Sequence, residues 1–410
     1  MTGALSHLRV LDLSRVLAGP FAAQMLGDLG AEVIKVERPG SGDDTRAWGP
    51  PFLHDDSGEP TRESAYFLCA NRNKKSVAID LAHPEGQRLV RALAAQADVV
   101  IENFKVGGLR QYGLDGEALR AAHPRLIWCA ITGFGQTGPY APRAGYDFLI
   151  QGMGGLMSLT GRADGEPGAG PQKVGVALTD IMTGLHATSA ILAALLHRER
   201  TGRGQTIDLA LLDVQVASLA NQAMNYLVSG VAPRRLGNAH PNVVPYQDFP
   251  TADGDMIIAV GNDGQFLRLC AALGHAEWGS DPRFATNALR VANREALIPL
   301  LRQATVTRPT REWVARLEAV GVPCGPINTL DAVFDDPQVQ ARGLALRMRH
   351  DAGAEVTLVA NPIRLSDTPP SYRTAPPLLG QHTREVLAGL LGLDTAAIAA
   401  LARAGAIAAP

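Results

Sequence analysis

Cysteine is scarce in this chain of 410 residues, and its few cysteines form no recognisable pattern. The thiols lie far apart, without CxxC or Cys/His spacing, at Cys69, Cys129, Cys270 and Cys324. This distribution argues against a disulfide framework or a zinc site. It predicts free thiols in a reducing compartment, and we expect no bound metal.

Long apolar runs and an excess of charge of one sign are also missing. No uninterrupted apolar stretch approaches the roughly 18 residues that span a bilayer, and the N-terminus lacks a basic region followed by an apolar core. The net charge of −2 gives no whole-chain basis for binding nucleic acid or an anionic membrane. With 46% hydrophobic and 19% charged residues, the composition predicts a cytoplasmic protein with a sizeable core.

A βαβ unit opens the chain, but it lacks the GxGxxG fingerprint of dinucleotide-binding folds. Residues 8–13 are typical of a buried strand, 20–29 of a helix and 32–37 of a second strand. The second strand ends in Glu37 and is followed by Arg38. An arginine at this place suits a ribose phosphate, as in the adenosine 3′-phosphate of CoA, better than the ribose hydroxyl of NAD.

Strands and helices continue to alternate at the spacing that predicts a parallel sheet. Residues 69–81 are interpreted as a basic turn that leads into a strand, further strands are indicated over 98–104 and 125–131, and a helix over 84–97. Ala18, Arg38 and Asn103 each come just after a strand. Because ligands of open α/β sheets bind outside the carboxyl ends of the strands, we expect these three residues along one rim.

The stretch from Pro171 to Asp213 carries the strongest candidate for chemistry. The apolar run 174–178 is interpreted as a short strand or loop, after which a period near 3.6 predicts a helix. Asp180 stands at this junction, where most aspartates are helix N-caps. Its neighbours are apolar, so a partly desolvated carboxylate here would be a better nucleophile than one in water. We expect small residues to leave open space beside it: Gly175, Gly184 and Ala187.

Other stretches carry less pattern. Residues 44–65 hold Pro, Gly, Asp and Ser and are interpreted as a surface loop. Lys74 and Lys75 are typical of a solvated turn. GVPCGPI, at 321–327, is interpreted as a linker between domains, and the Ala-rich tail 396–410 as a frayed end.

Several motifs agree in order and spacing with one family. The chain resembles the class III CoA-transferases (the CaiB/BaiF family, which includes formyl-CoA transferase) in the runs AGPFAAQMLGDLGAEVIKVERPGSGDDTR, ENFKVGGLRQYGL and GVALTDIMTG. In that family an aspartate at the position of Asp180 attacks the acyl-CoA thioester. The resemblance also implies contacts with CoA at Ala18, Arg38, Ile79, Asn103, Arg110, Arg143 and Tyr146.

The same resemblance implies an architecture: an α/β fold with a Rossmann-like open parallel sheet, a smaller α/β domain and an interlocked homodimer. Residues 1–225 are expected to form the first part of the large CoA-binding domain. Residues 226–330 would form the small domain with its linkers, and 331–410 would return to the large domain and its C-terminal helix.

A substrate class follows from the resemblance too. The run GNAH…VPYQDF is similar to the succinate–hydroxymethylglutarate branch, which handles dicarboxylates. It implies transfer of CoA from succinyl-CoA to a dicarboxylic acid through an aspartyl-CoA thioester on Asp180, without a permanently bound cofactor. Gly237, Asn238 and His240 are then candidates for a lid or an acceptor site.

Other functions stay open at this point. The α-methylacyl-CoA racemases resemble the chain over the same length, but their AGHD motif has a histidine where AGYD places Tyr146. Tyrosine, with a pKa of about 10, is a poor base at neutral pH. A non-catalytic CoA-binding subunit of a heteromeric transferase is a further alternative, against which the presence of Asp180 argues. The lack of GxGxxG in the opening βαβ unit disfavours an NAD dehydrogenase.

Overall fold

The computed structural model describes residues 3–409 of the chain. They divide into two compact units, one of residues 3–156, 174–224 and 338–409, the other of 157–173 and 225–337. The segment 157–173, expected in the large domain, belongs instead to the second unit. The amide of Asp164 donates to the carbonyl of Arg235 (3.2 Å) and their side chains form an ion pair. Contacts 71 positions apart in sequence therefore hold this segment.

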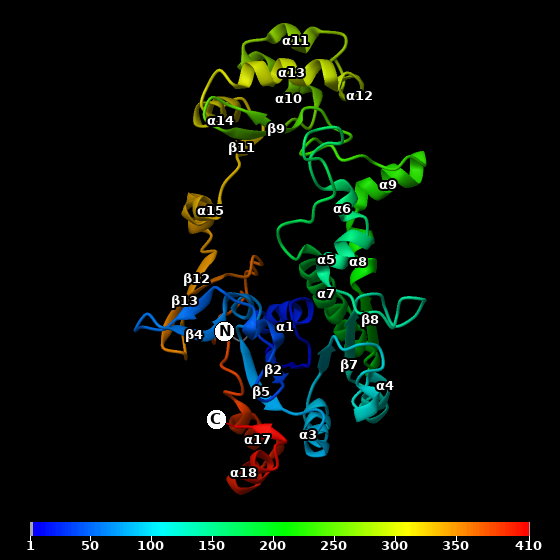
Figure 1. Cartoon of the computed structure of the whole chain (residues 1–410), viewed down its shortest axis with the longest axis vertical. Helices are drawn as coiled ribbons and strands as arrows, with labels where there is room; N and C mark the ends of the chain where they lie inside the picture. Colours follow the sequence, from blue (N-terminus) through cyan, green and yellow to red (C-terminus); the bar gives the residue numbers. More distant parts are fainter. Residues whose placement is uncertain (1–2, 410) are drawn as a thin grey trace. The chain divides into compact units, whose positions relative to one another are not determined.

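The first unit is built on a seven-stranded sheet. Its strands are β1 (Arg9–Asp12), β2 (Glu32–Glu37), β5 (Lys74–Ile79), β6 (Val99–Glu102), β7 (Ile127–Thr132), β8 (Thr206–Ala210) and β14 (Ile407–Ala408). They lie in the order β14-β5-β2-β1-β6-β7-β8, and only β14 runs antiparallel to its neighbour. Figure 1 labels β5, β2, β7 and β8 of this sheet. Numbered along the chain, the six parallel strands have the order 3-2-1-4-5-6 of dinucleotide-binding folds. The expected Rossmann-like open sheet is confirmed.

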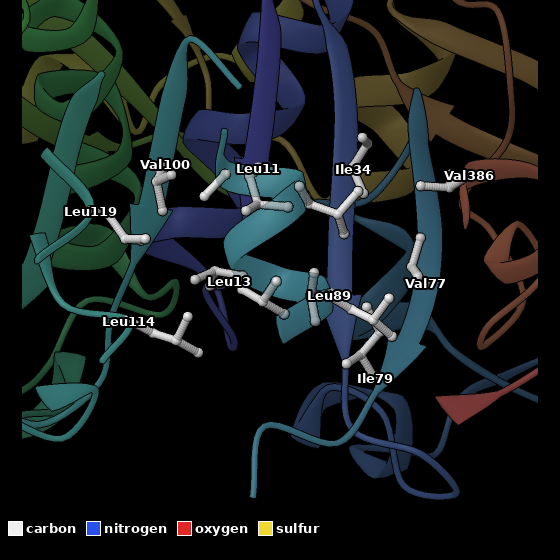
Figure 2. Packing of buried hydrophobic residues seen from close by; sticks show 14 of the residues in the cluster. Leu11, Leu13, Ile34, Val77, Ile79, Leu89, Val100, Leu114, Leu119 and Val386 are labelled. Atoms are coloured by element: carbon white, nitrogen blue, oxygen red, sulfur yellow. The ribbon is translucent and has the colours of Figure 1, made fainter. Parts of the chain in front are cut away.

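Helices cover both faces of this sheet because successive side chains of each strand point to opposite faces. Helices α1 (Ala18–Asp28) and α7 (Leu178–Thr201) share a cluster with Val10 of β1. Leu11, the next residue, belongs to the cluster of the other face, where the helices are α3 (Pro84–Ala94), α4 (Gly116–Ala122), α17 (Thr383–Leu391) and α18 (Thr395–Arg403). Figure 2 shows this second cluster, in which Leu11 and Ile34 from neighbouring strands meet Leu89 of α3.

Helix α7 is long and apolar enough to cross a membrane by length and composition alone. Half of its apolar window is buried within the described residues, however. The buried side chains Ala187, Ile191 and Leu195 lie in the same cluster as the sheet and α1. The apolar character of α7 is thus explained by its place in the core of the unit.

The remaining elements of the chain before Asn242 and after Asp336 are short. They are η1 (Asp44–Ala47), β3 (Phe52–His54), β4 (Pro60–Ser64), α2 (Ala65–Leu68), η2 (Arg110–Tyr112), α5 (Asp147–Met153), α6 (Leu156–Leu159), α8 (Leu211–Ser218), α9 (Ala220–Ser229), α16 (Pro337–Ala341), β12 (Ala345–His350) and β13 (Ala354–Val359). The pairs β3–β4 and β12–β13 form two small antiparallel sheets.

The interpretation of residues 44–65 as a surface loop is wrong. The segment contains η1, β3 and β4, and Arg46 within it is 7% exposed. The Arg46 guanidinium makes two hydrogen bonds to Glu37 (2.8 and 2.9 Å) and one to Glu63 (2.9 Å). Charged side chains buried against one another hold the segment in place, and hydrophobic periodicity cannot reveal that kind of packing.

The tail is likewise not frayed, in so far as it lies within the described residues. Ile398 and Leu401 of α18 are buried, and β14 pairs with β5 so that Ile407 lies opposite Ile79. A run of alanine with an apolar residue every third or fourth position forms a packed helix here.

The second unit has its own core around a three-stranded antiparallel sheet in the order β11-β10-β9. Its elements are β9 (Tyr246–Pro250), β10 (Asp255–Ala259), α10 (Asp263–Leu273), α11 (Ala276–Ser280), α12 (Asn287–Ala292), α13 (Arg294–Thr305), α14 (Thr310–Glu318), β11 (Cys324–Pro326) and α15 (Leu330–Asp335). Residues 321–327 are therefore no simple linker, because Cys324 pairs with Ile258 at the edge of this sheet.

Candidate active site

The crevice of the sheet lies between β1 and β6, where the strand order reverses. Ligands of such folds bind outside the carboxyl ends of the strands at this point. Asn103 follows β6, and its side chain crosses the crevice to Arg15, which follows β1. The side-chain oxygen of Asn103 accepts from the amide of Arg15 (2.9 Å), and its amide group donates to the Arg15 carbonyl (2.6 Å). Asn103 thus holds the turn between β1 and α1. Ala18 is the first residue of α1. Two of the three residues expected along one rim lie together here.

Two cavities open along this rim and share Arg15 and Phe104. The first has a volume of about 350 Å³ and is lined by Arg38 and Ile79, among others. Arg38 is exposed, and its guanidinium has no partner within residues 3–409. The second, of about 160 Å³, has Asp180 in its lining with four residues expected to contact CoA: Ala18, Asn103, Arg143 and Tyr146. The shared lining makes the two cavities parts of one groove.

Asp180 lies in the first turn of α7, and not at the end of a strand. Residues 174–177 form no strand, and the helix begins at Leu178 with Ala177 as its N-cap residue. Asp180 is therefore no N-cap. The amide of Val174 donates to Gln151 (2.9 Å), so the segment that leads into α7 is held by a side chain from another helix.

The carboxylate of Asp180 is buried without compensation. It is 8% exposed, and within the described residues its oxygens accept no hydrogen bond and meet no cation. The charge that acts on it is that of a second acid, Asp147, the first residue of α5. Burial and then the Asp147 charge raise the pKa of Asp180 from 3.8 to about 7. Near neutral pH the group is divided between acid and carboxylate, which suits a nucleophile that must also be a leaving group.

Two buried glutamines fix the backbone around Asp180. The amide of Asp180 donates to one oxygen of Asp147 (3.1 Å), and Gln151 donates to the other (2.7 Å). On the other side the Thr179 hydroxyl donates to Gln215 of α8 (2.6 Å). The first turn of α7 is therefore held from α5 and from α8, which leaves the Asp180 side chain as the part of this turn directed at the cavity.

The small residues beside Asp180 do not all leave open space. A Cβ on Gly184, one turn after Asp180, would lie 2.8 Å from the carbonyl oxygen of Ala18, and Ala187 is buried. Gly184 is needed because α1 and α7 approach each other closely there. Only Gly175 has free space around it, because a Cβ at that position would meet no atom within 4 Å.

Some predicted residues lie elsewhere. Arg110 lines a third cavity of about 480 Å³, and its guanidinium lies 3.4 Å from Glu117. Gly237, Asn238 and His240 belong to the second unit. There Gly237 has a φ of +61° and the amide of His240 donates to the carbonyl of Tyr246 (3.0 Å). The structure thus groups Asp180 with four of the seven expected CoA contacts and places Arg38 and Ile79 in the adjoining cavity.

Sequence reasoning missed an aromatic pair close to the acid. The rings of Trp48 and Tyr66 lie edge to face with centroids 5.1 Å apart. Burial, and after it the charge of Asp180, raises the pKa of Tyr66 to about 12, so its hydroxyl stays protonated and able to donate. Trp48 lies in the segment interpreted as a surface loop. The only feature of the sequence that could have pointed to the pair is an aromatic residue among polar ones. No group of three metal-ligating side chains is found in residues 3–409.

The raised pKa of Asp180 predicts a measurable effect on folding. Because the folded state favours the protonated acid, stability falls as the pH rises from about 3.8, the unfolded value, through about 7. Asp180→Asn keeps the size of the side chain and removes this titration. We expect the variant to be more stable than the parent by about 1–3 kcal/mol at pH 8 and equally stable near pH 4, as measured by urea unfolding at both values. Asp213→Asn, at an exposed acid on α8, is the control, and equal gains at both pH values would contradict the assignment.

Comparison with known proteins agrees with this geometry. Residues 5–383 match CoA-transferase family III. A succinate–glutarate CoA-transferase of Agrobacterium fabrum is 54% identical over 393 residues, 96% of this chain and 97% of the relative. The succinyl-CoA:glutarate CoA-transferase of Homo sapiens is 45% identical over 98% of this chain and 90% of the relative. A crystal structure of a CaiB/BaiF family protein from Brucella suis, 52% identical, has a TM-score of 0.83 and covers 95% of this chain and 100% of its own. The chain is a CoA-transferase and belongs to CoA-transferase family III.

Proposed function

We propose that this enzyme moves CoA from succinyl-CoA to a dicarboxylic acid such as glutarate, through acylation of Asp180. The observation that carries the proposal is the uncompensated carboxylate of Asp180 in the cavity at the crevice of the sheet. The relatives named as succinate–glutarate and succinyl-CoA:glutarate CoA-transferases support the choice of donor and acceptor.

In the first half of the reaction, a carboxylate oxygen of Asp180 attacks the thioester carbonyl of succinyl-CoA. The C–S bond breaks, CoA leaves as a thiolate, and a succinyl–aspartyl anhydride remains. The thiolate then attacks the Asp180 carbonyl of this anhydride. Succinate is released, and CoA is held as a thioester of Asp180.

In the second half, the acceptor carboxylate attacks the aspartyl thioester and expels the thiolate, which gives an acceptor–aspartyl anhydride. The thiolate attacks the acceptor carbonyl, so acceptor-CoA is formed and Asp180 returns as a carboxylate. No proton is gained or lost overall. The cycle needs donors for the oxyanions that form at each step.

The start of α1 offers such donors. Leu17 and Ala18 line the cavity of Asp180, and within the described residues their amides have no hydrogen-bond acceptor. The positive end of the helix adds to the field at this place. We assign oxyanion stabilisation to these amides, and the Gly237 loop is a second candidate for it.

The groove suits CoA at both ends. Arg38, exposed and without a partner among the described residues, is our candidate for the adenosine 3′-phosphate, with Ile79 and Ala82 against the adenine. Asn103, Arg143 and Tyr146 line the cavity of Asp180, where the pantetheine arm would end. Arg110, in the neighbouring cavity, would reach a phosphate only after leaving Glu117.

The wider proposal includes a homodimer in the cytoplasm. Helix α9 has no buried residue, and Leu227 and Val228 on it are 70% and 80% exposed in the single chain. Apolar side chains in such number on one helix favour cover by a second copy. The four free cysteines fit a reducing compartment. The loop with Gly237, Asn238 and His240 is our candidate for a lid that keeps water from the acylated aspartate.

Removing the nucleophile should abolish transfer and spare binding. We expect Asp180→Asn to lower kcat for succinyl-CoA and glutarate by roughly 10⁴-fold or more, while CoA binds with unchanged affinity in calorimetry. The aspartyl thioester should be trapped with hydroxylamine in the parent enzyme and located by peptide mass spectrometry. Product formation with an unmodified Asp180 peptide would refute the nucleophile, and failure of every dicarboxylate in a C4–C6 panel would refute the acceptor class.

The pH profile should report the Asp180–Asp147 pair. The nucleophile is the carboxylate, so kcat/KM of the free enzyme should fall as the pH drops through about 7. Asp147→Asn removes the like charge, and we expect the acidic limb to move to lower pH. The exposed-acid variant Asp213→Asn serves as control and should keep the profile of the parent. An acidic limb that stays in place in Asp147→Asn would show that Asp147 does not act on Asp180.

A further inference from the structure

Two lysines are buried beneath the turn that joins β1 to α1. Lys35 lies on β2 and Lys74 on β5, and they are 0% and 1% exposed. The interpretation of Lys74 as part of a solvated turn is therefore wrong. Lysine is almost never buried to this extent unless its ammonium group is paired. The partners of these two side chains show what they hold.

The ammonium groups bind the main chain on both sides of the turn. Lys35 donates to the carbonyl of Ser14 (2.8 Å), just before the turn, and Lys74 donates to the carbonyl of Pro20 (2.8 Å), just after it. Acids complete the cluster, since Lys74 also bonds Asp12 (2.9 Å) and Lys35 pairs with Asp43 (2.9 Å).

The turn between these anchors is strained. Val16 has a φ of +72°, a region that a β-branched residue rarely enters. Its amide donates to Asp43 (3.2 Å), the acid that Lys35 pairs with. The strained backbone is thus held by Asp43 and, through it, by Lys35.

Glycine does not supply this conformation. Dinucleotide-binding folds use a glycine-rich turn at the same place, so that the backbone can approach the phosphates. Here the turn reads SRVLAG, and its single glycine, Gly19, is needed because a Cβ would lie 2.3 Å from the Ser14 hydroxyl. The positive φ of Val16 must therefore be imposed by contacts from outside the turn.

We propose that Lys35 and Lys74 are positioning residues for CoA and its thioester, which hold the β1–α1 turn by its carbonyl oxygens so that the amides of Leu17 and Ala18 face the ligand. The inference rests on the proposed function, because it names what orders the backbone of that site. Lys35 borders the first cavity but its side chain is fully buried, and Lys74 lines neither cavity, so neither lysine needs to touch the substrate.

If the two lysines had a purely structural role, their loss would weaken CoA binding only as far as it lowers the stability of the protein. Two lysines face two acids, so the cluster is neutral, and replacing buried ion pairs by apolar side chains is often neutral for stability. Substitution of a lysine together with its acid should then leave a folded protein, whereas substitution of one lysine alone leaves a buried acid unpaired and lowers stability. Under our inference that protein has a disordered turn and binds CoA weakly.

The test uses Lys35→Met and Lys74→Met, with Lys75→Met as the matched control. Lys75 is the next residue of β5, and its ammonium group pairs with Glu32 and Glu385 away from the turn. In calorimetry with free CoA we expect the two buried variants to bind about ten- to a hundredfold more weakly, the range for losing a hydrogen bond to a charged group. The control should bind as the parent does. Should Lys35→Met fail to fold, the Lys35→Met/Asp43→Asn pair removes the unpaired acid and is measured in its place.

A rescue variant separates positioning from stability. Glycine adopts positive φ without strain, so Val16→Gly combined with Lys35→Met should recover a large part of the lost CoA affinity, with little change in the thermal unfolding midpoint. No recovery, or recovery only in step with stability, would overturn the inference, as would a Lys35→Met enzyme that binds CoA normally. A parent enzyme that does not bind CoA would instead overturn the proposed function itself.

Discussion

The structure depends on one carboxylate that is buried without a hydrogen bond or a cation among the described residues. Leaving such a group unpaired costs folding free energy, and the first unit is arranged so that the cost is tolerated. Gln151 and Gln215 hold the residues around Asp180 by their backbone or hydroxyl groups and leave its carboxylate alone. The contacts that would stabilise the charged form of Asp180, and so weaken it as a nucleophile, are made by its neighbours.

Two other buried acids of the same unit, Asp12 and Asp43, are stabilised in their charged form instead. Asp12 is fully buried, and although burial alone would raise its pKa, the ammonium groups of Lys74 and Lys35 hold that pKa below its ordinary value. Asp43 is held at a pKa of about 2, against the effect of burial, chiefly by Lys35. These acids stay charged at any physiological pH and act as fixed anchors. Asp180, in the groove, titrates near neutral pH, whereas Asp12 and Asp43, beneath the turn, do not. The reacting acid therefore differs in its electrostatics from the acids that hold the scaffold.

The sequence predicted the scaffold well and the polar packing poorly. Strands such as β2 were placed because apolar residues at each face mark them directly, whereas the strand order, with its reversal between β1 and β6, comes from the structure. Lys74, Arg46 and Glu63 were misjudged because a buried charge and a solvated charge look alike in a sequence. The difference lies in partners that are far away along the chain, such as Asp12 for Lys74 at 62 positions. The site itself was predicted unevenly for a related reason. Asp180 could be found because a family resemblance pointed to it, but its local structure could not, since the helix begins before it and without a capping side chain.

The two joined cavities bear on how a weak nucleophile can be effective. A carboxylate attacks a thioester poorly in water, so the reacting atoms must be brought together and held. Binding energy from parts of the substrate that do not react can supply this. In the proposed function, the nucleotide end of CoA is bound beside Arg38 while the thioester lies at Asp180, and Arg15 and Phe104 line both places. If the turn between these two places is rigid, binding of the nucleotide end also fixes the position of the thioester carbon at Asp180. If the turn is loose, part of that binding energy is spent on ordering the backbone instead.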